Sequence, residues 1–204
     1  MRRLIVSLTV AAAGLVALSP LLAQESKAPN PAKDAPPAAA APAAPATINP
    51  KLIVPFVNSA RTVFSTMCSI TTTVQRPHVK GTPSTSYDVS GLIGFSGEVI
   101  GSVVVSFQRS AAVKIVSAFT GTEMDADSPD FADAVGELTN MIAGSAKKDL
   151  GAVASISTPS VVIGAGHVIA RLSDVPCIVI PCSTPVGEFA VEVNIKQVAP
   201  GAAK

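Results

Sequence analysis

Between residues 48 and 199 the apolar positions recur at regular spacings, which predict short helices and strands. A helical spacing of three and four residues follows Asn49-Pro50. This pair suits a helix start, because Asn caps free amide groups and Pro fits the first turn. Pro55 would kink this helix or mark its real beginning, because proline has no backbone amide hydrogen. The apolar positions of the helix are Ile53, Phe56, Ala60, Val63 and Met67.

Two more helices are predicted in the middle of the domain. The first covers residues 109–119, and Gly121 ends it because glycine readily takes the left-handed conformation of a helix C-terminus. The second begins at Ser128-Pro129, a capping residue followed by proline, and runs to about Lys148. Lys147 and Lys148 suit its end, where positive charge complements the helix dipole.

Six further segments are predicted to be strands, from alternating apolar and polar residues in several of them and from a run rich in valine at residues 98–107. Ser96-Gly97 joins two of them in a tight hairpin, and residues 78–86 form a loop. In the last segment the polar residues Glu188, Glu192 and Asn194 point outward. Helices segregated from mostly antiparallel strands predict an α+β layered fold. The six segments are residues 69–76, 87–95, 98–107, 160–170, 176–182 and 187–196.

The first 23 residues have the pattern of a signal peptide or membrane anchor. Arg2 and Arg3 precede an uncharged run from Leu4 to Ala23, which is also about long enough to span a bilayer. The basic end would stay in the cytoplasm, so the rest of the chain would be periplasmic, or anchored and facing outward. A later translation start is the alternative, although no methionine lies between Met1 and Met67.

Residues 24–47 are rich in alanine and proline and predict a disordered linker. Repeated proline prevents both helix and sheet, so this segment would be an extended, semi-rigid spacer. The alternative is a disordered tail that has no function. Residues 48–199 would then form the one folded domain, which is an ordinary size for a domain.

Composition and charge exclude several classes of function. The formal net charge is +1, tryptophan is absent and tyrosine occurs once, so neither a basic patch nor a base-stacking surface for nucleic acid is expected. His78 and His167 lie in separate turns without the spacing of metal ligands, which predicts no metal site. Three cysteines form no disulfide framework and are expected to be small buried hydrophobes: Cys68, Cys177 and Cys182.

The helix from Pro129 to Lys148 has two distinct faces at 100° per residue. The polar face carries Asp133, Glu137, Asn140 and Gly144. An ordinary solvated helix face would also look like this. Asparagine and glycine are poor helix formers, however, so their use here favours a binding or catalytic face that another backbone approaches closely. The opposite, apolar face carries Phe131, Val135, Leu138 and Ile142.

The spacing Asp133-x-x-x-Glu137-x-x-Asn140, followed by Met141 to Gly144, resembles the signature of the CheC/CheX family of response-regulator phosphatases. The similarity extends over about 150 residues. One such motif per chain is similar to the CheX branch, whereas CheC usually carries two. Other segments that resemble the family are Asn49-Pro50 to Phe64, Ser157 to Gly164 and Gly187 to Phe189.

The resemblance implies a CheC/CheX-like fold and the hydrolysis of an aspartyl phosphate on a CheY-like response regulator. It implies that Asn140 orients the attacking water and that Glu137 pairs with a lysine of the regulator. Asp133 and Gly144 would support docking. Mg²⁺ would belong to the partner, and this chain would have no metal or cofactor of its own. The family also implies a homodimer.

Two hypotheses for the function remain open. Retention of both Glu137 and Asn140 favours a phosphatase, whose phosphorylated partners are expected in the cytoplasm. The signal-like start instead directs the domain out of the cytoplasm, which favours a non-catalytic envelope module for dimerisation or as an adaptor. Membrane association is expected only through the N-terminal segment.

Overall fold

The computed structural model describes residues 49–198. The predicted signal segment, residues 1–23, and the predicted linker, residues 24–47, lie outside the described residues. The helices are α1 (Pro50–Met67), α2 (Arg109–Thr120) and α3 (Pro129–Asp149). The strands are β1 (Thr73–Val74), β2 (His78–Val79), β3 (Val89–Gly97), β4 (Val99–Phe107), β5 (Ala154–Ile156), β6 (Ser160–Ile163), β7 (Ile178–Thr184) and β8 (Gly187–Gln197).

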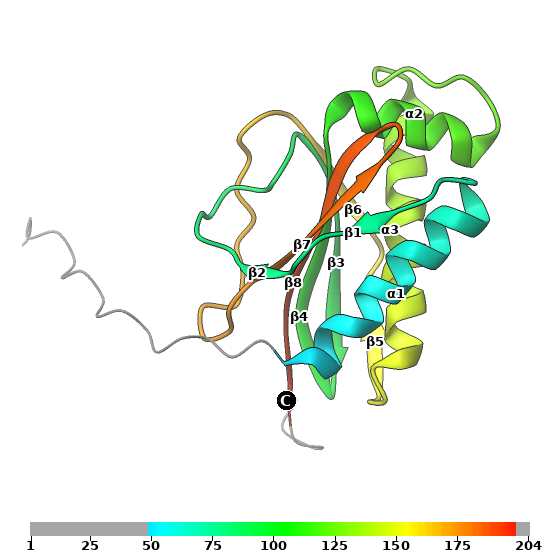
Figure 1. Ribbon diagram of the computed structural model, residues 1–204. Coiled ribbons are helices and arrows are strands. Elements are labelled where there is room, and N and C mark those ends of the chain that lie inside the picture. The colour runs from blue at the N-terminus through cyan, green and yellow to red at the C-terminus, as the bar shows by residue number, and fades with distance from the viewer. Residues whose placement is uncertain (1–48, 199–204) are drawn as a thin grey trace, which may run out of the picture. The chain divides into compact units, whose positions relative to one another are not determined.

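The strands of this domain form one antiparallel sheet, and the helices pack together on one face of it (Figure 1). The central order is β1-β7-β8-β4-β3-β5, with β2 pairing to β7 and β6 pairing to β3. This arrangement confirms the predicted α+β layered fold. Strands β3 and β4 form the predicted hairpin, and Gly97 in its turn has a φ of 104°.

The helix ends follow from local sequence. The side chain of Asn49 accepts a hydrogen bond from the Lys51 amide at 3.1 Å, and Pro55 lies inside α1 without ending it. Gly121 closes α2 with a φ of 71°. Ser128 caps α3 by accepting a hydrogen bond from the Asp130 amide at 3.3 Å. All three predicted helices are therefore present within one or two residues of the expected bounds.

Aromatic side chains join α1 to the sheet. Phe64 stacks on Phe189 of β8 with ring centroids 4.3 Å apart, and Phe107 of β4 lies 5.7 Å from the same ring. Phe56 meets Phe95 of β3 edge-on at 5.9 Å. These large buried rings contribute apolar area that stabilises the helix layer on the sheet.

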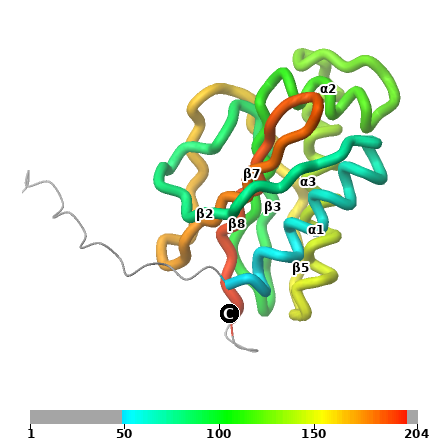
Figure 2. The backbone as a smooth tube through the Cα atoms, in the orientation of Figure 1, coloured from blue at the N-terminus to red at the C-terminus, as the bar shows by residue number. Residues whose placement is uncertain are grey.

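Two loops cover much of the face of the sheet that carries no helices. Residues 80–88 and 164–177 lie side by side there (Figure 2), and Ser84 and Val168 form a bridge between them. Under these loops, Glu192 and Asn194 are each only 1% exposed. The prediction that these two side chains point away from the helices is confirmed. They do not reach solvent, because the loops lie over them.

Glu192 sits at the centre of a buried ion cluster. One carboxylate oxygen accepts hydrogen bonds from Lys80 Nζ at 2.9 Å and from the Ser86 amide at 2.7 Å, and the other accepts from Arg171. Both loops are therefore tied to the same carboxylate. Asn194 adds a second tie, because its Oδ1 accepts a hydrogen bond from the Leu172 amide at 2.7 Å.

Several predicted strands are shorter than expected. The segment 69–76 forms a strand only at Thr73–Val74, and the segment 160–170 only at Ser160–Ile163. The latter ends because Gly164 and Gly166 take φ values of 155° and 69°, which begin the loop over the sheet. Strand β5 was not predicted, and β2 lies in the segment predicted to be a loop.

The three cysteines are free thiols. Cys68 and Cys182 are buried, as predicted, and burial raises the pKa of Cys68 to about 11 and that of Cys182 to about 12. Cys177 is only partly buried. Among the helices of residues 49–198, none is both long enough and apolar enough to cross a bilayer.

Candidate functional site

The polar face of α3 is open to solvent. Asp133 and Glu137 are exposed, and Asn140 and Gly144 are partly exposed. The opposite face is completely buried, with zero exposure at Phe131, Val135, Leu138 and Ile142. The two faces predicted from the spacing are therefore present, and the candidate residues can be reached by another protein.

The position of α3 depends on a close contact with β3. A Cβ atom at Gly91 would lie 1.9 Å from Oγ1 of Thr139, so only glycine allows the helix to approach this closely. Thr139 is fully buried, and its hydroxyl donates a hydrogen bond to the Val135 carbonyl at 2.8 Å. Thr139 directly precedes Asn140 in α3, so this contact fixes where the polar face stands above the sheet.

Glu137 and Asn140 lie one helical turn apart and face each other. Nδ2 of Asn140 is 3.5 Å from Oε2 of Glu137, a long hydrogen bond between exposed groups. Within residues 49–198 the Asn140 side chain makes no other hydrogen bond, and no lysine, arginine or histidine pairs with Glu137 or Asp133. The amide and both carboxylates are therefore free to bind groups from outside.

A small hollow of about 330 Å³ lies beside these residues. Asp133 and Glu137 border it, and it is lined by Pro159, which directly precedes β6, and by Val161 of β6. Gly136 of α3 also lines the hollow, where it faces Pro159. A Cβ atom there would lie 3.4 Å from Cγ of Pro159.

The Pro159 segment is held to the sheet by Ser157. The Gly94 amide donates a hydrogen bond to Oγ of Ser157 at 3.0 Å, and the Ser157 amide donates to the Gly94 carbonyl at 3.0 Å. Pro159 and Val161 were not among the residues predicted for the site. They lie in the segment Ser157 to Gly164, but its local pattern does not show that it borders α3, because their neighbours in the hollow lie more than twenty residues earlier in the chain.

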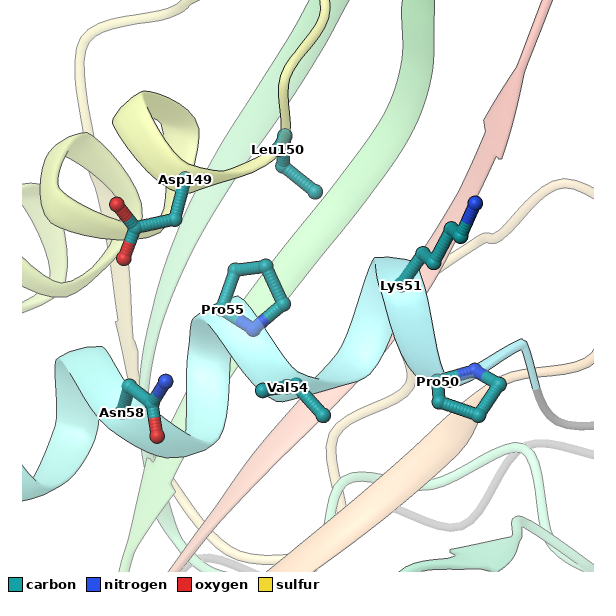
Figure 3. Close-up of a pocket in the computed structure, with 7 residues that line it drawn as sticks. All are labelled: Pro50, Lys51, Val54, Pro55, Asn58, Asp149 and Leu150. Carbon is teal, nitrogen blue, oxygen red and sulfur yellow. The ribbon is translucent and has the colours of Figure 1, made fainter.

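A larger hollow of about 510 Å³ lies between the start of α1 and the end of α3 (Figure 3). It contains none of the predicted site residues. Its charged residues are Lys51 and Asp149, and their charged ends point in different directions.

Metal ligands are not clustered in the described part of the chain, where no group of three or more His, Cys, Asp or Glu side chains is placed to hold an ion. Both ring nitrogens of His167 lie near oxygens of the loops, at 2.7 Å from the Gly164 carbonyl and 3.1 Å from the Thr85 hydroxyl. His167 therefore helps to hold the loops together.

The antiparallel sheet, the helix layer on one face and the Glu–Asn helix above it define a protein of the CheC/CheX-like class. A family model described as "Chemotaxis phosphatase CheX" matches residues 89–183. The chemotaxis protein CheX from Desulfovibrio desulfuricans is 36% identical, with a TM-score of 0.66, and the match covers 72% of this chain and 99% of that one. The chain belongs to the CheX family.

Two other solved structures extend the comparison. A CheC-like superfamily protein from Shewanella sp. PV-4 is 33% identical over 74% of this chain and 100% of that one, with a TM-score of 0.67. A chain of the CheX–CheY–BeF₃–Mg²⁺ complex from Borrelia burgdorferi is 25% identical over 72% and 98% of the two chains, with a TM-score of 0.61. No curated protein sequence matches the chain significantly.

Proposed function

We propose that this protein hydrolyses the aspartyl phosphate of a CheY-like response regulator. The observation that carries the proposal is the exposed pair Glu137 and Asn140, one turn apart on a helix that is firmly seated on the sheet. Membership of the CheX family supports it, as does the Borrelia burgdorferi complex, in which a CheX is bound to CheY.

Asn140 would position the attacking water. An acyl phosphate is already a good electrophile, so holding water in line with the phosphorus atom is the main task. A carboxamide can donate and accept hydrogen bonds at once, and it is neutral beside an anionic phosphoryl group. The Asn140 amide makes only one long hydrogen bond in its own chain, which leaves it able to do so.

Glu137 would pair with a lysine of the regulator, while Asp133 and Gly144 support docking. Such a pair fixes the register of the two proteins and draws the lysine away from the phosphoryl group. Mg²⁺ would be bound by the regulator. It would neutralise charge on the phosphoryl oxygens, and the CheX–CheY complex of Borrelia burgdorferi includes both Mg²⁺ and BeF₃.

We predict that Asn140→Ala lowers the catalysed rate by about a hundredfold, because water is no longer oriented. The measurement is the loss of phosphoryl label from CheY-like regulators, phosphorylated with labelled acetyl phosphate, on adding residues 47–204. Lys148→Ala is the matched control, since it changes an exposed residue of the same helix outside the site. An unchanged rate with wild-type protein, across a panel of regulators, would refute the proposal.

A second candidate is an envelope adaptor or dimerisation module that keeps the fold without turnover. The signal-like start at Arg2 and Arg3 favours it, because phosphorylated regulators are expected in the cytoplasm. In that case regulators would be neither bound nor dephosphorylated by the wild-type domain, and Asn140→Ala would change nothing.

A further inference from the structure

The hollow beside Glu137 combines an apolar wall with an acidic border. Pro159 and Val161 provide the wall, and Asp133 and Glu137 provide carboxylates on the side formed by α3. At about 330 Å³ the hollow can hold the end of one long side chain, and it opens on the same surface as Asn140.

The charge of this surface selects the kind of side chain that fits. No lysine, arginine or histidine occurs between Ile115 and Ala146, although the whole chain has a net charge of +1. Neither Asp133 nor Glu137 forms an ion pair with a described residue. Because Glu137 would be paired with the lysine of the regulator, Asp133 is the carboxylate left free beside the apolar wall. This arrangement matches a basic side chain, whose methylene stem packs on apolar surface while its charged end meets the acid.

We infer that this hollow receives a basic side chain of the response regulator, distinct from the lysine that Glu137 would bind, and thereby selects which regulator docks. The inference rests on the proposed function and adds a specificity determinant to it. Asp133 meets the charged end, and Pro159 and Val161 contact the stem.

Gly136 supports this inference independently. A Cβ atom at this position would lie 3.4 to 3.6 Å from Pro159 and Val161, which is ordinary contact distance. Alanine would therefore fit, and it is a better helix former than glycine. Packing alone would favour alanine here, whereas glycine keeps the hollow open to a partner.

The test compares Asp133→Asn with Asp130→Asn, which removes the same charge from an exposed position at the start of α3, outside the hollow. Dephosphorylation of a regulator by the purified domain is measured over a range of regulator concentrations. We expect Asp133→Asn to raise KM about tenfold with little change in kcat, because a charged hydrogen bond in docking is lost. Asp130→Asn should change KM less than twofold.

Gly136→Ala supplies a second readout. We expect it to raise the melting temperature and yet raise KM several-fold, because the added methyl group narrows the hollow. A purely structural role for Gly136 would instead give a less stable protein with unchanged KM.

The outcomes separate this inference from the proposed function. If the wild-type domain is active but Asp133→Asn behaves like Asp130→Asn, the inference is wrong and the phosphatase stands. If the wild-type domain neither binds nor dephosphorylates any regulator, both are wrong. Equal losses in kcat for Asp133→Asn and Asn140→Ala would also overturn the inference, since Asp133 would then act on the chemistry.

Discussion

The periodicity of the sequence predicted correctly the faces on which the side chains of Asn140 and Glu192 lie. The surroundings of the two side chains nevertheless differ. Asn140 remains partly exposed on α3, with one long hydrogen bond to Glu137. Glu192 points away from the helices on β8, yet it is buried by two loops and paired with Lys80 and Arg171. The first is available for chemistry, whereas the second holds the covering loops to the sheet.

At this scale we predict that Glu192→Ala lowers the free energy of unfolding by about 3–5 kcal/mol, because it leaves two buried cations without their partner. Urea unfolding followed by circular dichroism gives the change. Glu188→Ala is the matched control on the same strand, where the carboxylate is exposed and only a small loss is expected. A loss below about 1 kcal/mol for Glu192→Ala would contradict a structural role for the ion cluster.

Among the elements, α3 carries the candidate site, and its close contact with β3 determines where the site residues lie above the sheet. The contact between Gly91 and Thr139 leaves no room for any side chain at position 91. The strand pattern of residues 87–95 did not show what Gly91 meets, because Thr139 lies 48 residues later in the chain. The helix itself was predictable, since its cap, its apolar stripe and its basic end are all local.

Gly91→Ala is expected to destabilise the domain by about 1–3 kcal/mol and to lower phosphatase activity, because α3 must move away from the sheet. Thermal melting and the dephosphorylation assay measure the two effects. Gly81→Ala serves as control, since nothing lies within 4 Å of a Cβ atom there. A stable, fully active Gly91→Ala protein would show that the position of α3 does not matter for the site.

The whole molecule combines a CheX-family domain with an N-terminal segment that predicts export. These two features have opposite implications for the partner, because a cytoplasmic regulator cannot reach a domain outside the membrane. The described residues contain no helix that could cross a bilayer, so the prediction of location depends on residues 1–23 alone.

We predict that alkaline phosphatase fused after residue 47 is active outside the cytoplasm, because the basic start and apolar run direct export. The measurement is enzyme activity in intact cells. The control is the same fusion without residues 2–23, which should be inactive. A stable but inactive full-length fusion would place the domain in the cytoplasm and remove the conflict with the phosphatase.

The sequence by itself determined the helices, the central hairpin, the α+β class and the common face of Glu137 and Asn140. These follow from caps, glycines and apolar periods that act within a few residues. Only the tertiary structure decided that Glu192 is buried, that β5 exists and that Pro159 closes a hollow against Gly136. Each of these depends on segments far apart in the chain, whose contacts no local pattern encodes.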